Sequence, residues 1–145
     1  MNLFLCGGGS NTQILEALRT FASKIDKSKP ILYIPLAWES DNYDSCYEWF
    51  KTEIKYMQIS KFDMVNSSKE LSQKNFNDYS ALFIGGGNTY KLLKEIKDNS
   101  NAEKIIKYLN ENGTIFASSA GAIIFGKDIN TCINDDDGGS IYELY

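Results

Sequence analysis

Ser119 lies between a β-prone segment, residues 113–117, and a small, apolar segment that begins at Ala120. A serine at an abrupt strand-to-helix turn exposes its hydroxyl as a nucleophile. In the G-x-S-x-G elbow, small residues on either side of the serine let strand and helix approach, and the next backbone N–H, here that of Ala120, faces the forming oxyanion. The local sequence fits this elbow except at its first glycine, which is Ala117. The pattern predicts a nucleophilic serine.

A second candidate feature is the run of three glycines at residues 85–87, which follows the apolar segment 81–84. Three glycines leave backbone N–H groups unshielded and adopt positive φ readily, as an anion-binding or oxyanion-binding turn requires. Asn88 or Thr89 would then cap the helix that follows. The alternative interpretation is an ordinary tight turn between a strand and a helix, because glycine-rich turns are common.

Together, the two motifs resemble those of the dipeptidase E family of serine peptidases, a group related to cyanophycinase. The resemblance covers most of the chain: it begins at Asn2–Gly9, passes through Ile34-Pro35 and the glycine run, reaches Ser119–Ala122 and fades near the end. It implies a fold like that of the class I glutamine amidotransferases, hydrolysis of small peptides with an N-terminal aspartate, and no metal or organic cofactor. The site residues that it implies are the nucleophile Ser119, the oxyanion donors Ala120 and either Gly86 or Gly87, and Asn88 in the substrate-binding turn.

The resemblance also implies an acidic residue in an Asn-Asp pair sixteen positions after the serine, which here is Asp135. Asp135 would orient the base, although residues 135–139 can also be read as a solvated acidic turn. The chain contains no histidine. Because a serine hydroxyl is a weak nucleophile until a base takes its proton, three alternatives stay open. The chain is a C-terminally shortened product, another group replaces the histidine, or the protein no longer catalyses.

Two side chains are candidates for that replacement. Lys127 can act as a base only if burial or a nearby cation lowers its pKa, and its spacing from Ser119 favours a solvated position at the end of a short helix. Glu39 follows an expected strand and could approach the carboxyl edge of the sheet, or be a loop carboxylate. The competing function is a catalytically silent homologue that binds peptides or small carboxylates, and a third is an interaction module.

Composition fits one soluble globular domain that spans residues 1–145, with 43% hydrophobic and 23% charged residues. The net charge of −4 and the absence of a basic cluster with interleaved aromatics argue against nucleic acid as a partner. No apolar stretch approaches the ~20 residues that span a bilayer, so we expect no membrane segment. Cys6, Cys46 and Cys132 are widely spaced and odd in number, which indicates reduced thiols and a cytoplasmic location.

The expected elements alternate between strand and helix, which predicts a three-layer, doubly wound α/β domain with a mainly parallel sheet. The family resemblance implies that this domain is incomplete at its C-terminus. An incomplete sheet would leave an edge unpaired and favours a homo-oligomer. A rival interpretation is nucleotide binding at Gly7–Ser10, but Thr12 occupies the last glycine position of G-x-G-x-x-G. We expect strands at 2–6, 31–36, 57–63, 80–84 and 113–117, and helices at 11–25, 42–55, 88–98 and 101–111.

Overall fold

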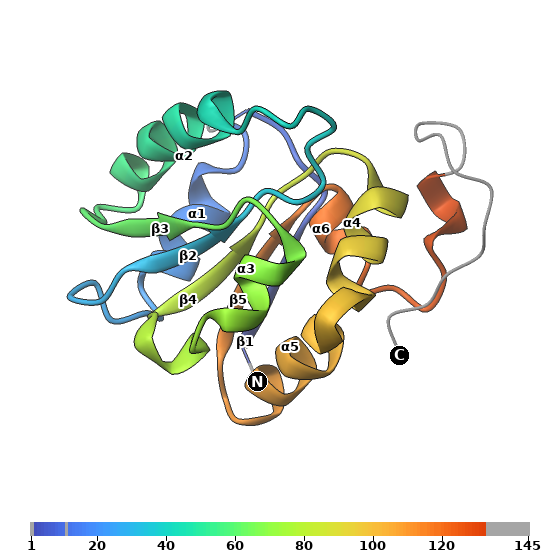
Figure 1. Ribbon diagram of the computed structural model, residues 1–145. Helices are drawn as coiled ribbons and strands as arrows, with labels where there is room; N and C mark the ends of the chain where they lie inside the picture. The colour runs from blue at the N-terminus through green and yellow to red at the C-terminus, as the bar shows by residue number, and fades with distance from the viewer. Residues whose placement is uncertain (1, 11, 133–145) are drawn as a thin grey trace.

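A computed structural model describes residues 2–10 and 12–132 of the chain (Figure 1). Five strands form one sheet in the order β1-β5-β4-β2-β3, and each neighbouring pair is parallel. The strands are β1 (Asn2–Cys6), β2 (Ile31–Ile34), β3 (Phe62–Met64), β4 (Ala81–Ile84) and β5 (Thr114–Ser118). The helices are α1 (Leu15–Ala22), α2 (Asp44–Tyr56), α3 (Ser68–Gln73), α4 (Thr89–Lys97), α5 (Asn101–Asn110) and α6 (Ala120–Ile123), and the 3₁₀ turns are η1 (Phe76–Asp78), η2 (Asp98–Ser100) and η3 (Ile129–Cys132).

Helices cover both faces of the sheet, which confirms the predicted three-layer α/β architecture. Helices α1 and α2 pack on one face, and α3, α4, α5 and α6 pack on the other (Figure 1). Side chains of a strand point alternately to the two faces, so Phe83 of β4 faces α1 and α2 while Leu82 and Ile84 face the other helices. All residues of β2 and β4 are buried, as expected for strands covered on both sides.

A row of four aromatic residues crosses the sheet on the face that α1 and α2 cover. We call it the aromatic row, and it consists of Phe4, Phe116, Phe83 and Tyr33, which are register partners on four neighbouring strands. Neighbouring ring centroids along the row are 6.4, 4.9 and 5.9 Å apart. The ring of Phe50 in α2 stacks on that of Tyr33, with 4.1 Å between the ring centroids, so the aromatic row packs directly against α2.

The expected strand at 57–63 is wrong over most of its length. Helix α2 continues to Tyr56, the chain turns at Gln58 with a φ of 57°, and β3 begins only at Phe62. Met57 and Ile59 carried the strand pattern, but both are buried because they fill the core beneath the end of α2. Apolar residues two positions apart fit a strand face, and a helix terminus followed by a turn can bury the same pair.

The helices are short. Helix α1 occupies Leu15–Ala22 instead of the expected 11–25, because a hydrogen-bonded turn between Ser10 and Gln13 precedes it. Helix α2, with 13 residues, is the longest in the described part of the chain. Within residues 2–10 and 12–132, no helix has the length and apolarity needed to cross a membrane.

Helix α3 was not expected from the sequence, and it begins at a capping box. The hydroxyl of Ser67 accepts a hydrogen bond from Glu70 N–H at 3.1 Å, and the Glu70 carboxylate accepts one from Asn66 N–H at 2.9 Å. The first bond satisfies a donor that a helix start leaves without a partner, and the second ties Glu70 to the residue before the N-cap, so the arrangement is a variant of the capping box. The Ser-x-x-Glu spacing was therefore a usable signal for this helix.

Candidate active site

Ser119 adopts a backbone conformation that residues other than glycine rarely adopt. Its φ is 52° and its ψ is −119°, directly between β5 and α6. Its N–H donates to the carbonyl oxygen of Cys6 at 2.8 Å, and its own carbonyl accepts from Ala122 N–H at 2.8 Å. Positive φ at a β-carbon-bearing residue costs free energy and persists where surrounding contacts impose it. Here, the last rung of the β1–β5 pairing and the first turn of α6 impose it.

The elbow depends on a glycine after the serine and tolerates an alanine before it. A β-carbon added at Gly121 would lie 2.5 Å from the carbonyl oxygen of Ile84, so α6 approaches β4 closely only because this residue has no side chain. Ala117, which replaces the first glycine of the pattern, is fully buried within β5 and packs on the face that α4 and α6 cover. The incomplete G-x-S-x-G match therefore still forms the strand-to-helix turn that it predicted.

The three glycines after β4 each lie against a different part of the site. A β-carbon at Gly85 would lie 3.2 Å from the Tyr33 ring, and one at Gly86 would lie 2.9 Å from Ser119 Cβ and 3.3 Å from its Oγ. Gly87 has a φ of 137°, and a β-carbon there would lie 2.7 Å from the carbonyl carbon of Ala37. The turn thus brings the chain after β2, the chain after β4 and the elbow serine together.

Backbone donors gather at this turn. Within the part of the chain that the structure describes, no protein acceptor binds the N–H groups of Gly86, Gly87 or Ala120. Asn88 caps α4, because its side-chain oxygen accepts from Lys91 N–H at 3.0 Å. The cap confirms the sequence expectation for Asn88 and places the start of α4 immediately after the glycine turn.

The loop after β2 is tied to the first turn of α4. Asn88 N–H donates to the Ala37 carbonyl at 2.8 Å, and the Asn88 side-chain amide donates to the Glu39 carboxylate at 3.3 Å. The Lys91 ammonium donates to the Trp38 carbonyl. These bonds tie the loop to the start of α4. Glu39 is an exposed loop residue, one of the two alternatives that the sequence left open, and its carboxylate accepts from Asn88. Lys127 is exposed in the chain that follows α6, as the solvated interpretation expects.

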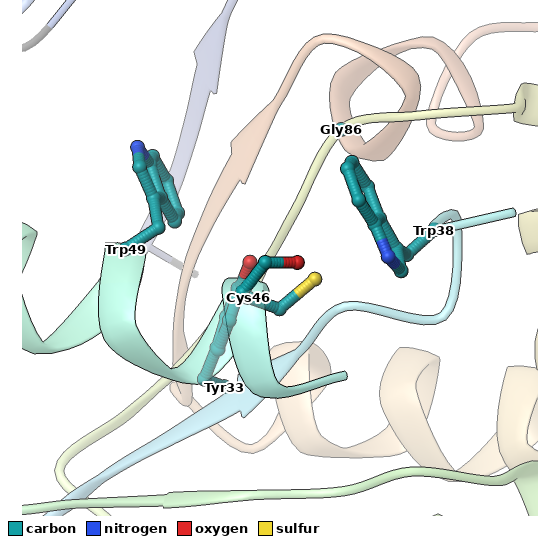
Figure 2. Close-up of a pocket in the computed structure, with 6 residues that line it drawn as sticks. Tyr33, Trp38, Cys46, Trp49 and Gly86 are labelled. Carbon is teal, nitrogen blue, oxygen red and sulfur yellow. The ribbon is translucent and has the colours of Figure 1, made fainter. Parts of the chain in front are cut away.

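A pocket of about 370 Å³ opens beside the glycine turn (Figure 2). Cys46 and Trp49 come from α2, Tyr33 from β2 and Trp38 from the loop after it. Burial, with smaller contributions from Cys46 and Glu53, raises the pKa of Tyr33, and burial also raises the pKa of the Cys46 thiol. Both groups therefore stay neutral near pH 7. The residues that line the pocket are Tyr33, Trp38, Ser45, Cys46, Trp49 and Gly86.

Sequence reasoning had pointed to the elbow and the glycine turn but not to this pocket. Its aromatic residues read as core positions, and only the fold brings α2 and the β2 loop to the glycine turn. Gly8 also lies beside the serine, since a β-carbon there would lie 3.5 Å from Ser119 Cβ. Asp135, the expected partner of the base, lies outside the described residues.

An all-parallel α/β sheet that carries a serine on a strained elbow, next to a glycine turn on the neighbouring strand, is an architecture of hydrolytic enzymes. Comparison with known proteins narrows this class. The model of peptidase family S51 matches residues 3–141, and the chain belongs to this family.

Named relatives agree with this membership. Peptidase E of Haemophilus influenzae (strain PittGG) is 24% identical over 105 residues, which are 72% of this chain and 44% of that protein. The chain thus matches less than half the length of this curated relative. Two crystal structures share the fold. A candidate peptidase E of Listeria monocytogenes EGD-e has a TM-score of 0.76 at 23% identity, covering 94% of this chain and 67% of that one. A peptidase from an acI-B1 Actinobacterium has a TM-score of 0.68 at 18% identity, covering 88% and 57%.

Proposed function

We propose that this protein is a serine-type peptidase that hydrolyses small peptides through Ser119. The observation that carries the proposal is the elbow itself. Ser119 is held at a φ of 52° by backbone hydrogen bonds on both sides, and its side chain lies against the bare backbone of Gly86. A fold without catalytic duty gains nothing from this strain, whereas strained residues cluster at active sites.

The proposed reaction proceeds in two steps. The Ser119 oxygen forms a bond to the peptide carbonyl carbon, its proton passes to a base, and the carbonyl oxygen becomes an oxyanion. The N–H groups of Ala120 and of Gly86 or Gly87 donate to this oxyanion. The C–N bond then breaks, the amine leaves with a proton, and water hydrolyses the acyl-enzyme to release the acid and restore the serine.

The proposal also covers the identity of the base and of the substrate. Asp135 orients the base, as the family resemblance implies. Since the chain contains no histidine and Lys127 is exposed, Glu39 or a group from outside the chain takes the proton of Ser119. The resemblance also supports an N-terminal aspartate as the first residue of the substrate. We place the protein in the cytoplasm, a proposal supported by the odd number and wide spacing of its three cysteines.

A binding protein without catalysis is the second candidate. The observation that favours it is that, among the described residues, Ser119 Oγ has no hydrogen bond to a carboxylate or an amine, in a chain with no histidine. Removing one member of a Ser-His-Asp triad leaves roughly 10³–10⁴-fold catalysis over water, from binding and the oxyanion donors. A silent homologue would keep the elbow and bind peptides without turning them over.

Hydrolysis of an aspartyl dipeptide separates the two candidates. We expect the wild-type chain to release free aspartate at a rate that Ser119→Ala reduces to background, with unchanged binding of the dipeptide. Ser118→Ala is the matched control, because Ser118 is the neighbouring serine at the end of β5 and should keep the wild-type rate. Equal rates for wild type and Ser119→Ala, in samples with the same melting temperature, would support the binding protein and contradict the peptidase.

A further inference from the structure

The pocket and the elbow both border on Gly86. Gly86 lines the pocket, and the same residue lies against the side chain of Ser119. A substrate side chain in the pocket can therefore belong to a residue next to the peptide bond that Ser119 would attack. Ligand pockets of enzymes have volumes of about 300–1,000 Å³, and about 370 Å³ falls in this range.

Aromatic rings form most of the lining. Trp38 and Trp49 stand on opposite sides of the pocket, with Tyr33 and Cys46 between them (Figure 2). Trp38 is 40% exposed and Trp49 is 44% exposed, so each indole keeps an uncovered surface. Tyr33 is held in place from behind, because its ring stacks on Phe50 and its edge rests against Gly85. Rings placed in this way suit an edge-to-face or offset stack with another ring.

Charge is absent from the lining. None of the six lining residues carries a charge near pH 7, since burial raises the pKa values of Tyr33 and Cys46. Lys91 acts electrostatically on Cys46, but its ammonium already donates to the Trp38 carbonyl and lies 3.5 Å from the Tyr43 hydroxyl. A carboxylate inside the pocket would lose water without gaining a charged partner, which is costly. The pocket is therefore unsuited to an aspartate side chain.

We propose that this pocket holds an aromatic side chain of the peptide substrate, at the residue next to the aspartate. The proposal rests on the proposed peptidase function and specifies its substrate class: aspartyl dipeptides whose second residue is aromatic. The aspartate then occupies a separate part of the site, outside the six residues that line the pocket. Burying a ring against Trp38, Trp49 and Tyr33 supplies the selectivity.

Binding to the Ser119→Ala protein tests the proposal without any turnover. The ligands are Asp-Phe and Asp-Ala, which differ only in the ring, and calorimetry gives both dissociation constants. We expect Asp-Phe to bind at least about tenfold tighter. The chain has two tryptophans, and both line the pocket, so indole fluorescence reports on the pocket alone. Asp-Phe should change this fluorescence, and Asp-Ala should change it much less.

Two second-site variants locate the effect. Trp49→Ala in the Ser119→Ala background should bring the affinity for Asp-Phe to within about threefold of that for Asp-Ala. Tyr56→Ala is the matched control, because Tyr56 lies on the same helix, is 39% exposed and does not line this pocket. It should retain the full preference. A thermal melt of each variant confirms that the fold is intact.

The outcomes distinguish this proposal from the proposed function. Equal affinities for Asp-Phe and Asp-Ala, or a preference that survives Trp49→Ala, overturn the aromatic pocket even if the wild-type chain hydrolyses aspartyl peptides. A preference that depends on Trp49, in a chain that hydrolyses neither dipeptide, upholds the pocket and contradicts the peptidase. If Ala-Phe binds as tightly as Asp-Phe, the aromatic pocket is upheld, and the proposed preference for an N-terminal aspartate is contradicted.

Discussion

The two faces of the sheet are built from different residues, and the pocket beside the candidate site lies on only one of them. The face under α3 to α6 is mainly aliphatic, with Leu82, Ile84 and Ile115 fully buried at its centre. The face under α1 and α2 carries the aromatic row and is the one with the substrate-sized pocket beside Ser119. Branched aliphatic side chains fill space without gaps, whereas flat rings meet at fixed angles. The aromatic face thus contains the pocket, and both faces contribute fully buried side chains to the core.

The largest effects come from opening a cavity on each face in turn. Phe83 and Leu82 are neighbours on β4, both fully buried, and they face opposite sides. We expect Phe83→Ala to lower the free energy of unfolding by about 4 kcal/mol and Leu82→Ala by about 3 kcal/mol in urea titrations. Only Phe83→Ala should alter tryptophan fluorescence in the folded state, because the Phe83 ring lies 6.4 Å from that of Trp49. A similar fluorescence change in Leu82→Ala would show that the faces are not independent.

The glycine turn joins the two faces, because Gly85 contacts Tyr33 and α4 follows on the other side. Gly87→Ala places a β-carbon on the Ala37 backbone at a φ of 137°, so we expect a loss of about 3 kcal/mol in the free energy of unfolding. Gly7→Ala is the control, since a β-carbon there would have nothing within 4 Å. Comparable melting temperatures for the two variants would contradict the close contact at Gly87.

On the aliphatic face, Lys104 of α5 holds the end of α3. Its ammonium donates to the carbonyl oxygens of Ser72 at 2.8 Å and of Lys74, and it lies 4.5 Å from the centre of the Phe76 ring. We expect Lys104→Met to lower the free energy of unfolding by about 1.5 kcal/mol in thermal melts, because these carbonyls lose a charged donor. Lys107→Met, on the same helix with a 74% exposed side chain, should change it by less than about 0.5 kcal/mol. An equal effect of both substitutions would exclude this role for Lys104.

The smallest effect concerns the alkaline stability of the aromatic face. Burial raises the folded-state pKa of Tyr33 above its ordinary value of 10.0, so the unfolded chain loses this proton first as the pH rises. The contribution of the neutral Tyr33 hydroxyl to the free energy of unfolding is fully present below pH 10. It falls above pH 10 by up to about 1.4 kcal/mol per pH unit. Urea midpoints should therefore fall less between pH 9 and about pH 11 in Tyr33→Phe than in wild type. An unchanged fall would show that Tyr33 ionises within the folded protein.

Local sequence patterns predicted much of the fold. Continuous apolar runs marked β2 and β4 as strands covered on both faces, and Asn88 marked the start of α4. The elbow and glycine turn were predicted because each consists of consecutive residues. The error at 57–63 arose where Met57 and Ile59 suit a strand face as well as a helix end, and only packing beneath α2 distinguishes the two.

The pocket could not be predicted in the same way. Tyr33, Trp38 and Trp49 lie on three separate segments, and nothing in their local sequence distinguishes a pocket wall from a core position. They meet because β2 pairs with β4 and brings α2 and its own following loop to the glycine turn. The sheet order, which places β2 beside β4 and β4 beside β5, is a long-range property that sequence periodicity does not encode.

The central claim is that Ser119 on the elbow is an activated nucleophile. The most direct measurement is labelling of the folded chain with a fluorophosphonate, which reacts with activated serines, followed by mass spectrometry of the peptide that contains both Ser118 and Ser119. We predict one label, on Ser119, which is lost in Ser119→Ala and kept in Ser118→Ala. An unlabelled Ser119 in a chain that melts cooperatively, or a label on another serine, would contradict the claim.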